Sequence, residues 1–396
     1  MIDTSKKDYF VIFGGGGIRG LAYCGAYKAL LENNIKLTGC AGSSIGAVFA
    51  SLLAIGYNYE EIYEIISETG FDLFIDINVG LKEIAFSKGN IFLDWMREKI
   101  EKKFYGEKYQ KGKMPPFKFC DLKNKLIVFS VDLTNLKFKE FSNEKTPDFE
   151  IAKAVRASVS MPGLFTPVED DNKLLVDGDL LKSTPLWRVT NSIKDLEERI
   201  IEFRLEDNET PKTINNSIEY INRVYNAICG FATDYIIDMY KEKDKFDYIK
   251  INTQDISVVD FLIAKEKKQE LFEIGYERTK KYFDNFFPAK RKLLYSKYEK
   301  LLEHLYSFQK QFNKTNTINS YLKLCEMFMF LCEEKRYLDT KIYDKILTFK
   351  NNYTKNYSSH NFFGIKGALL FNKENLAKDL LEIIKLTTIK CEELKN

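Results

Sequence analysis

Apolar and polar positions alternate regularly over the first sixty residues of the chain. Two short apolar runs, Tyr9–Phe13 and Lys36–Gly42, have the length and composition of buried strands. Each is followed by a segment rich in small and apolar residues with helical spacing, first Arg19–Glu32 and then Ile45–Ile55. The order strand, helix, strand, helix is typical of a parallel sheet covered by helices. The sequence therefore predicts an α/β fold with a mainly parallel central sheet flanked by helices.

Further elements continue this pattern until it changes near residue 287. In chain order, the predicted elements are a helix at Glu60–Glu68, strands at Leu126–Asp132 and Lys137–Phe141, a helix from the cap Thr146 and Pro147 to about Ser158, strands at Lys173–Val176 and Ile200–Leu205, a long amphipathic helix at Ile214–Tyr240, and a strand at Tyr248–Asn252. After Pro288 the pattern is helical only. We therefore predict an α/β domain over residues 1–287 and an all-α C-terminal region over residues 288–396.

Composition and charge narrow the class of protein. A formal net charge of only +3 argues against a dedicated nucleic-acid binder, although the helical region is more basic than the rest. The seven cysteines contain no CxxC pair, which indicates neither a disulfide framework nor a zinc site and favours a reducing compartment. The uncharged stretch Leu37–Tyr59 is crowded with Gly and Ser in its first half, which favours a strand, a turn and a buried helix over a membrane span. We expect a cytoplasmic protein without a signal peptide or transmembrane helix.

A glycine-rich segment, GGGGIRG, lies between the first predicted strand and helix at positions 14–20. Its spacing of Gly15, Gly17 and Gly20 matches the dinucleotide-binding fingerprint. That kind of site also needs an acidic residue at the end of the second strand, and the strand KLTGCAG carries no carboxylate. No Gly-Lys-Ser/Thr follows, so a P-loop is excluded as well. A bound phosphate is therefore not predicted here.

The second strand ends in Gly42-Ser43-Ser44-Ile45-Gly46, a GxSxG motif between a strand and a helix. This context is that of a nucleophile elbow, in which a sharp turn lifts the serine hydroxyl above the sheet. Attack by a serine on an ester converts the carbonyl oxygen into an anion, which backbone N–H groups of a glycine loop can stabilise. Loss of one such donor costs on the order of 10²–10³ in rate. The two motifs together predict that Ser44 is a nucleophile and that the glycine loop stabilises the oxyanion.

A serine nucleophile also needs a base to accept its proton. The only two histidines, His304 and His360, lie in the helical region and not at a predicted strand end. Asp177 follows the apolar run 174–176 and precedes Gly178, so it stands at a strand end, where α/β folds expose functional groups. Asp177 is therefore the candidate base, with an ordinary Asp-Gly turn as the alternative interpretation.

These segments, together with RASVSMPGLFTP at positions 156–167 and DGD at 177–179, resemble the patatin-like phospholipase family in order and spacing over roughly residues 8–285. The resemblance implies a Ser–Asp dyad of Ser44 and Asp177 that needs no cofactor and no metal. It also implies an oxyanion hole formed by the loop of Gly15, Gly16 and Gly17, with Arg19 holding that loop in place. Asp179 stands where the family usually has Gly or Ala. Its carboxylate is expected either to crowd the site and raise the pKa of Asp177 or to point away, and we expect activity to survive.

The resemblance further implies hydrolysis of fatty-acyl esters of phospholipids or lysophospholipids through an acyl-enzyme. The substrate lies in a phospholipid membrane, so we expect peripheral membrane contact, through the basic and aromatic segment Lys102–Phe119, which we predict to be a surface loop, or through the helix Lys366–Lys395. The alternative to membrane contact is, for that helix, packing within its own domain. For the segment, the alternative is a surface loop without a membrane role. Two other functions remain open: a neutral-lipid esterase or lipase, and a patatin-fold scaffold whose helical tail binds a partner protein. An activating protein could also bind through residues 288–396, whereas no nucleic-acid partner is expected.

Overall fold

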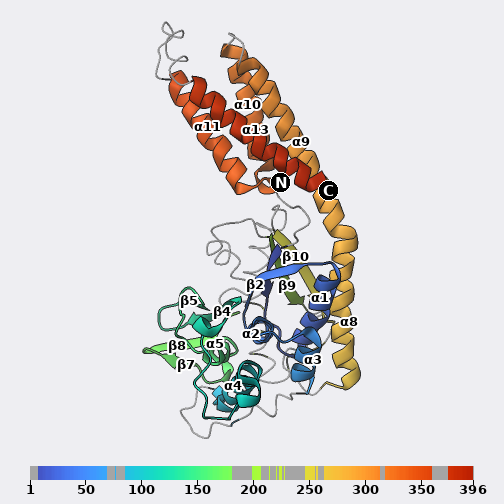
Figure 1. Ribbon diagram of the computed structural model, residues 1–396, viewed down its shortest axis with the longest axis vertical. Helices are drawn as coiled ribbons and strands as arrows, with labels where there is room; N and C mark the ends of the chain where they lie inside the picture. Colours follow the sequence, from blue (N-terminus) through green and yellow to red (C-terminus); the bar gives the residue numbers. More distant parts are fainter. Residues whose placement is uncertain are drawn as a thin grey trace. The chain divides into compact units, whose positions relative to one another are not determined.

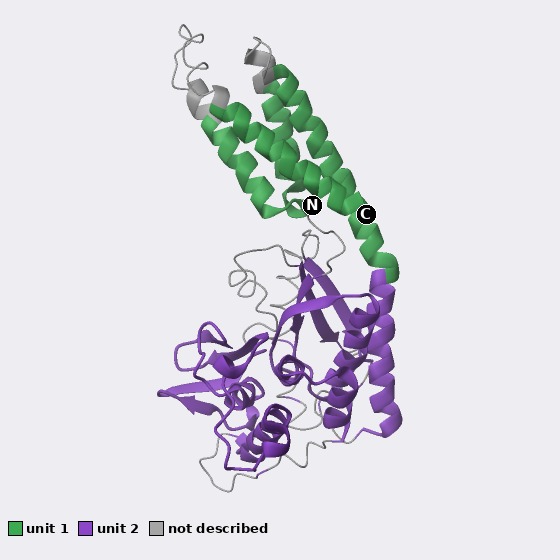
Figure 2. Cartoon of the chain, viewed as in Figure 1, with its two compact units in different colours: residues 1–4, 242–245, 284–396 green, residues 5–241, 246–283 purple. Residues whose placement is uncertain are grey.

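The structure is a computed structural model of the 396-residue chain. It describes residues 8–68, 76, 85–180, 199–206, 214, 220, 223–224, 227, 246–254, 256, 263–312, 317–358 and 373–395. The chain divides into two compact units, with the described residues up to 283 in one and those from 284 onward in the other (Figure 2).

The first unit is an α/β structure. Its strands are β1 (Asp8–Phe13), β2 (Lys36–Gly42), β3 (Ala85–Ser87), β4 (Lys125–Asp132), β5 (Lys137–Ser142), β6 (Gly163–Phe165), β7 (Val168–Asp170), β8 (Lys173–Asp177), β9 (Arg199–Glu206) and β10 (Phe246–Asn252). Its helices are α1 (Leu21–Glu32), α2 (Ile45–Ile55), α3 (Tyr59–Ser67), α4 (Asn90–Tyr105), α5 (Ile151–Ser158) and α8 (Lys265–Lys281) (Figure 1). Short 3₁₀ turns occupy Gly17–Gly20, Gly106–Lys108 and Phe119–Asp121.

Most of these strands form one mixed sheet in the order β10-β9-β1-β2-β4-β8-β7, with β5 also paired to β4. The five strands from β10 to β4 are parallel to one another, whereas β5 and β8 are antiparallel to β4 and β7 is antiparallel to β8. A separate pair, β3 and β6, is parallel. The prediction of an α/β fold with a mainly parallel sheet is therefore confirmed.

Strands β2 and β8 end facing each other along one edge of β4. Residues 127–128 of β4 pair with β2 on one side and β5 on the other, and residues 130–132 pair with β8 and β5, so β2 and β8 share the side opposite β5. Strand β2 ends at Gly42 opposite Val128, and the antiparallel β8 ends at Asp177 opposite Ser130. The gap along β4 is two residues, or roughly 7 Å. The segments that leave these two strands must therefore meet.

Aromatic side chains fill the core beneath the ends of the parallel strands. The Phe13 ring contacts the rings of Tyr23, Phe49 and Phe203 at centroid distances of 5.2, 4.7 and 5.8 Å, and all four side chains are buried. Such clusters bury a large apolar area with a fixed geometry. They give the segments that follow β1 and β2 a rigid support.

Helices α1 and α8 pack closely against each other through two glycines. A Cβ atom at Gly25 would lie 1.9 Å from the carbonyl oxygen of Phe272, and one at Gly275 would lie 1.9 Å from that of Ala22. Both positions therefore require glycine for the two backbones to approach this closely.

The described residues of the second unit form helices: α9 (Phe287–Phe312), α10 (Thr317–Glu334), α11 (Thr340–Ser358) and α13 (Lys373–Lys395), with a 3₁₀ turn at Lys335–Tyr337. Its hydrophobic core is formed by these helices themselves, with members such as Tyr298, Met327 and Ile346. A helical C-terminal region is thus confirmed. Helix α13 contributes Leu376, Leu380, Ile383 and Ile384 to this core, so these apolar positions pack within the unit.

Several predicted bounds need correction. The helix predicted from Thr146 begins at Ile151, because residues 143–150 form a turn: Thr146 Oγ1 accepts a hydrogen bond from Ser142 N (3.0 Å), and the carbonyl of Pro147 accepts one from Cys120 N (2.8 Å). Helix α4 was not predicted, and it includes residues 102–105 of the segment assigned to a surface loop. The predicted helix Ile214–Tyr240 lies mostly outside the described residues, as do residues 366–372 of the predicted tail helix.

Across the described residues, we find no helix that combines the length and hydropathy needed to cross a membrane.

Candidate active site

Ser44 lies at the turn between β2 and α2, and its backbone is strained. Its φ of 53° and ψ of −128° place a non-glycine residue in a sparsely populated conformation, which is typical of a nucleophile elbow. A Cβ atom at Gly42 would lie 2.2 Å from the carbonyl oxygen of Gly46, and one at Gly46 would lie 2.1 Å from that of Phe13. The turn that presents Ser44 therefore requires both glycines of the GxSxG motif.

The glycine loop that follows β1 is fixed by two neighbouring side chains. Gly16 and Gly17 have φ angles of 151° and 58°, a region that favours glycine. The buried Arg19 donates from Nε to the carbonyl of Gly16 at 3.1 Å, and its backbone N–H donates to the same oxygen at 3.3 Å. Tyr23 donates from its hydroxyl to the carbonyl of Gly14 at 2.7 Å. The carbonyl oxygens of Gly14 and Gly16 are thereby fixed by hydrogen bonds. The N–H groups of the loop can therefore bind other acceptors.

The N–H groups near Ser44 divide into used and available donors. The N–H of Gly15 donates to the carboxylate of Asp179. For Gly16, Gly17 and Ile45, the described part of the chain supplies no acceptor for the N–H group. Ile45 is also the first residue of α2, where helix N–H groups have no partner within the helix. These groups are the donors that could bind an oxyanion in the geometry shown.

Asp177 ends β8, and the turn that follows it is linked to Ser44 by hydrogen bonds to Ser158, the last residue of α5. Ser158 Oγ accepts a hydrogen bond from Ser44 N at 3.0 Å, and its carbonyl accepts one from Gly178 N at 3.2 Å. Asp177 itself is 1% exposed, and its Oδ1 accepts the N–H of Asp179 at 2.9 Å. One residue therefore joins the serine elbow to the Asp-Gly turn, as the facing ends of β2 and β8 require.

The structure brings Ser44 and the turn of Asp177 together but does not place them in direct hydrogen-bond contact. Within the described residues, the hydrogen bonds of Ser44 are those of its backbone, and its hydroxyl has no hydrogen bond to Asp177. Hydrogen bonds between catalytic groups are often long without substrate and tighten when substrate binds. The assignment of nucleophile and base therefore stays a prediction.

Asp179 lies inside the site and does not point away from it. Its Oδ1 accepts a hydrogen bond from the Ser43 hydroxyl, next to Ser44. A Cβ atom at Gly15 would lie 1.7 Å from Asp179 Oδ2 and 3.2 Å from Ser44 Cβ, so the carboxylate, the glycine loop and the nucleophile crowd around one point. Burial raises the pKa of Asp179, although Arg204, Ser43 and the N–H of Gly15 act in the opposite direction.

Arg204, on β9, is the main charge facing Asp179. Burial alone would lower the pKa of Arg204, but the Asp179 carboxylate and other acidic neighbours raise it. Its Nη1 atom is buried without a hydrogen-bond partner among the described residues and lies 3.6 Å from the position of a Cβ on Gly14. The sequence analysis missed Arg204 and Ser158. Ser158 lies within the segment RASVSMPGLFTP, whereas nothing in the local sequence marks Arg204 among the arginines.

Arg156, the first residue of the segment RASVSMPGLFTP, has a structural role. The buried guanidinium donates to the carbonyls of Gly89 (2.9 Å), Lys88 (2.6 Å) and Thr166 (2.8 Å) and to the hydroxyl of Ser160. Burial lowers its pKa to about 10, so the group remains charged at neutral pH. Arg156 therefore ties the chain that follows α5 to the turn before α4 and acts as a structural brace.

No histidine is found among the described residues of the α/β unit that holds Ser44. His304 lies in α9 of the helical unit, where its ring faces Phe330 at a centroid distance of 5.1 Å. His360 lies outside the described residues. The described residues contain no cluster of His, Cys, Asp or Glu able to hold a metal ion.

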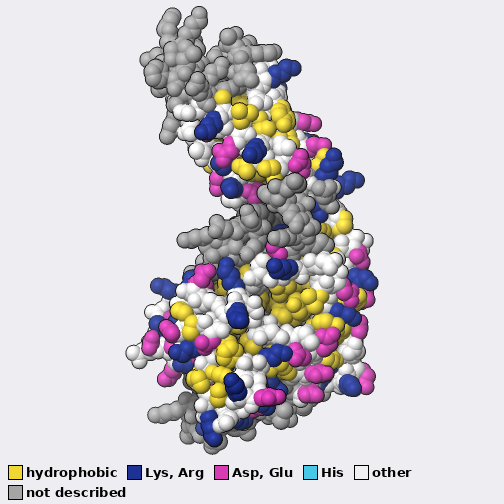
Figure 3. Space-filling view, in the orientation of Figure 1, with side chains coloured by type: hydrophobic (Ala, Val, Ile, Leu, Met, Phe, Trp, Pro, Cys, Tyr) yellow, Lys and Arg dark blue, Asp and Glu magenta, His cyan; other side chains and the backbone are white. Residues whose placement is uncertain are grey.

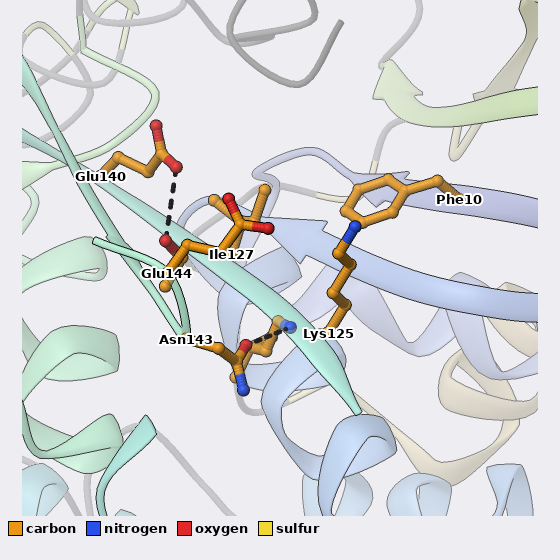
Figure 4. Close-up of a pocket in the computed structure, with 8 residues that line it drawn as sticks. Phe10, Lys125, Ile127, Glu140, Asn143 and Glu144 are labelled. Atoms are coloured by element: carbon orange, nitrogen blue, oxygen red, sulfur yellow. Dashed lines mark hydrogen bonds between the residues drawn. The ribbon is translucent and has the colours of Figure 1, made fainter. Parts of the chain in front are cut away.

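A pocket lies at the opposite ends of the parallel strands. It is lined by Phe10, Lys125, Ile127, Glu140, Asn143 and Glu144, among others (Figure 4). Lys125 begins β4, and its neighbour Leu126 donates its N–H to Asn143 Oδ1 at 3.0 Å. Catalytic groups of parallel sheets are expected at the carboxyl ends of the strands, where Ser44 lies. We therefore do not assign catalysis to this pocket.

Comparison with known proteins shows what this chain is similar to. Residues 11–189 match the family model of patatin-like phospholipases. Uncharacterized protein R571 of Acanthamoeba polyphaga mimivirus is 30% identical over 277 residues, which cover 67% of this chain and 90% of the viral protein. Lysophospholipase NTE1 of Kluyveromyces lactis is 26% identical over 287 residues, which cover 67% of this chain and 18% of the yeast protein. The structure of VipD from Legionella pneumophila aligns with 98% of this chain and 88% of its own, at 15% identity and a TM-score of 0.49.

The fold and these relatives define a lipid acyl hydrolase or phospholipase of the patatin-like class. The chain belongs to the patatin-like phospholipase family.

Proposed function

We propose that the protein hydrolyses fatty-acyl esters of phospholipids or lysophospholipids through an acyl-enzyme, with Ser44 as nucleophile and Asp177 as general base. The observation that carries this proposal is the strained Ser44 at the start of α2, which shares Ser158 as a hydrogen-bond partner with the turn after Asp177. The name of the yeast relative, a lysophospholipase, supports the substrate class.

In the first half of the reaction, Ser44 Oγ attacks the acyl carbonyl carbon while Asp177 accepts the hydroxyl proton. The carbonyl oxygen becomes an anion, which the N–H groups of Gly16, Gly17 and Ile45 are available to stabilise. The tetrahedral intermediate then collapses, the bond to the alcohol oxygen breaks, and Asp177 returns its proton to the leaving alcohol. The acyl chain remains bound to Ser44 as an ester.

In the second half, water attacks the acyl-serine carbonyl and gives its proton to Asp177. Collapse of the second tetrahedral intermediate breaks the bond to Ser44 Oγ, which takes the proton back, and the fatty acid is released. The net reaction consumes one water and yields one acid and one alcohol. Both halves use the same base and the same donors, so the proposed chemistry requires no metal and no cofactor.

The substrate class is tested by comparing lipids that share the acyl ester and differ in the alcohol. We expect release of fatty acid from phosphatidylcholine and lysophosphatidylcholine to exceed release from an emulsified triacylglycerol, because the relative acts on a lysophospholipid. Mass spectrometry of the released acids measures all three substrates in one assay. Preferential cleavage of the triacylglycerol would instead assign the protein to the neutral-lipid esterases.

We further propose that the enzyme works at the surface of a phospholipid membrane, in a reducing compartment such as the cytoplasm. The described cysteines are free thiols, which agrees with such a compartment. The segment between α4 and β4 is the better candidate for membrane contact, because the apolar stripe of α13 is used in the core of its own unit. Lys108 and Lys113 in that segment are exposed, and Phe104, near the end of α4 beside it, is half exposed.

Charges of both signs are interspersed over the described part of the face shown in Figure 3, so this face does not by itself identify the membrane contact. A local test is therefore needed. We expect the double variant Lys108→Glu/Lys113→Glu to bind vesicles of phosphatidylserine and phosphatidylcholine about tenfold or more weakly, because one basic residue near an anionic surface contributes about 1 kcal/mol. Vesicle sedimentation measures the affinity. The matched control, Lys265→Glu/Lys280→Glu on α8, changes the net charge equally, and an equal loss in the control would contradict a local role of the segment.

A further inference from the structure

The DGD turn places a second carboxylate where the reaction needs a site for an oxyanion. Asp179 is 4% exposed, and its carboxylate is bonded both to the Ser43 hydroxyl and to the N–H of Gly15. Gly15 belongs to the loop whose N–H groups are the predicted donors to the oxyanion. The chain therefore binds its own anionic side chain with a donor of that loop.

The space around Gly15 shows how closely this carboxylate approaches the nucleophile. The position that a Cβ atom would take on Gly15 lies 1.7 Å from Asp179 Oδ2 and within van der Waals contact of Ser44 Cβ. A substrate oxyanion held by this loop would thus develop its charge beside the carboxylate. The negative charges of the oxyanion and of the Asp179 carboxylate would repel each other strongly, because they would lie close together in a buried site.

We propose that Asp179 gates the glycine loop: as a carboxylate it occupies the Gly15 donor and opposes oxyanion formation, and Ser44 reacts when Asp179 is protonated or has moved off Gly15. This inference rests on the proposed ester chemistry of Ser44 and adds to it a residue that controls when that chemistry runs. Asp179 is a positioning residue in this account, because it acts on the donor loop and not on the substrate.

Charged and titratable groups on every neighbouring described element determine when Asp179 is neutral. Arg204 on β9 and Arg19 after the glycine loop favour its charged form. Asp177 precedes it in the same turn, Tyr23 faces it from α1, and Glu202 contributes to the same buried group of charges. Burial is the largest influence and raises the pKa of Asp179, so the neutral form persists to higher pH than for an exposed aspartate.

The charge of Asp179 makes the rate of acylation depend on pH. Wild-type acylation requires neutral or displaced Asp179, so its rate falls as the pH rises through the raised pKa of Asp179. In Asp179→Asn the side chain keeps its shape and carries no charge, so this alkaline decrease disappears. Above the decrease, we expect Asp179→Asn to react about tenfold or more faster than wild type, because the charge that repels the oxyanion is gone. Asp179→Gly should gain more, because it also frees the N–H of Gly15, and one oxyanion donor can contribute on the order of 10²–10³ in rate.

The experiment measures the rate of labelling by a fluorophosphonate, with intact-mass detection, between pH 5 and 9. The full-length proteins are wild type, Asp179→Asn, Asp179→Gly and Ser44→Ala, with Asp132→Asn as a control for loss of a buried carboxylate outside the site. Asp132 is 6% exposed and bonds to Asn135 in its own turn. The gate predicts faster alkaline labelling of both Asp179 variants and an unchanged profile for Asp132→Asn.

A second variant tests the same idea without changing Asp179. Removing the positive charge in Arg204→Met raises the pKa of Asp179 further, so the alkaline decrease should move to higher pH. An unmoved decrease, or one moved to lower pH, would overturn the gate.

The outcomes separate this inference from the proposed function. Labelling of wild type at Ser44, with the same rates and profile in Asp179→Asn, overturns the gate and leaves the ester chemistry standing. Slower labelling of both Asp179 variants also overturns it, because Asp179 would then support the site and not block it. Labelling that is absent from wild type and from every variant, at all pH values, overturns the proposed function and the gate together.

Discussion

Replacing Ser44 with alanine is expected to lower the rate of hydrolysis of a soluble acyl ester by on the order of 10⁴–10⁶, as is usual when the nucleophile of a serine hydrolase is removed. Among the described residues, the hydroxyl of Ser44 has no hydrogen-bond partner, and the hydrogen bonds of Ser44 are those of its backbone. Alanine keeps the Cβ atom and tolerates the same turn as serine does. The variant should therefore fold and unfold as the wild type does while losing its activity.

The matched control is Ser51→Ala, which removes a hydroxyl from α2, the helix that follows Ser44. Ser51 is fully buried, and its Oγ has no hydrogen-bond partner among the described residues, so its loss should leave both the rate and the thermal unfolding midpoint nearly unchanged. Initial rates on a p-nitrophenyl ester, with circular dichroism of both variants, make the comparison. A Ser44→Ala enzyme with more than a few per cent of wild-type activity would remove Ser44 from the role of nucleophile.

The second large effect is expected for Asp177→Asn, with a loss of about 10²–10⁴ in kcat, the usual contribution of a general base. Asparagine has the same shape, and its oxygen can still accept the N–H of Asp179, a bond that measures 2.9 Å in the native chain. It cannot take the proton of Ser44. The loss should therefore appear in kcat, with little change in stability, and steady-state kinetics on a soluble ester measures it.

Two controls isolate the base. Asp132→Asn removes a buried carboxylate elsewhere on the sheet and should retain most of the activity. The double variant His304→Ala/His360→Ala removes the only histidines of the chain and should also remain active, because His304 lies in the helical unit against Phe330. If the histidine variant lost as much activity as Asp177→Asn, the Ser–Asp assignment would be wrong.

Local sequence patterns are sufficient to predict the elements that carry the site. Strand β2 and helix α2 have the predicted bounds, because an apolar run that ends in a glycine turn followed by an apolar helix has few alternatives. The start of helix α5 was predicted four residues too early, because Thr146 and Pro147 are common at helix starts and are used here in a turn. The signal for a helix cap cannot show that its oxygen already accepts a hydrogen bond from Ser142.

Meeting of the two site motifs could not be predicted from the residues alone. It depends on the antiparallel placement of β8, which ends opposite Ser130, two residues beyond the end of β2 along β4. The same long-range geometry places Ser158 between the motifs and the charge of Arg204 near Asp179. Ser158 lies in the segment RASVSMPGLFTP, whereas no local signal marks Arg204. The sequence marks Asp179 as a departure from the family pattern, and only the structure places its carboxylate against the glycine loop.

The measurement that tests the central claim most directly is intact-protein mass spectrometry after treatment with a fluorophosphonate, with wild type beside Ser44→Ala. The account predicts a single adduct on the wild type, mapped by peptide analysis to Ser44, and none on the variant. An adduct that persists on Ser44→Ala, or an unlabelled wild type across the pH range and in the presence of phospholipid vesicles, would contradict an activated serine at the elbow after β2.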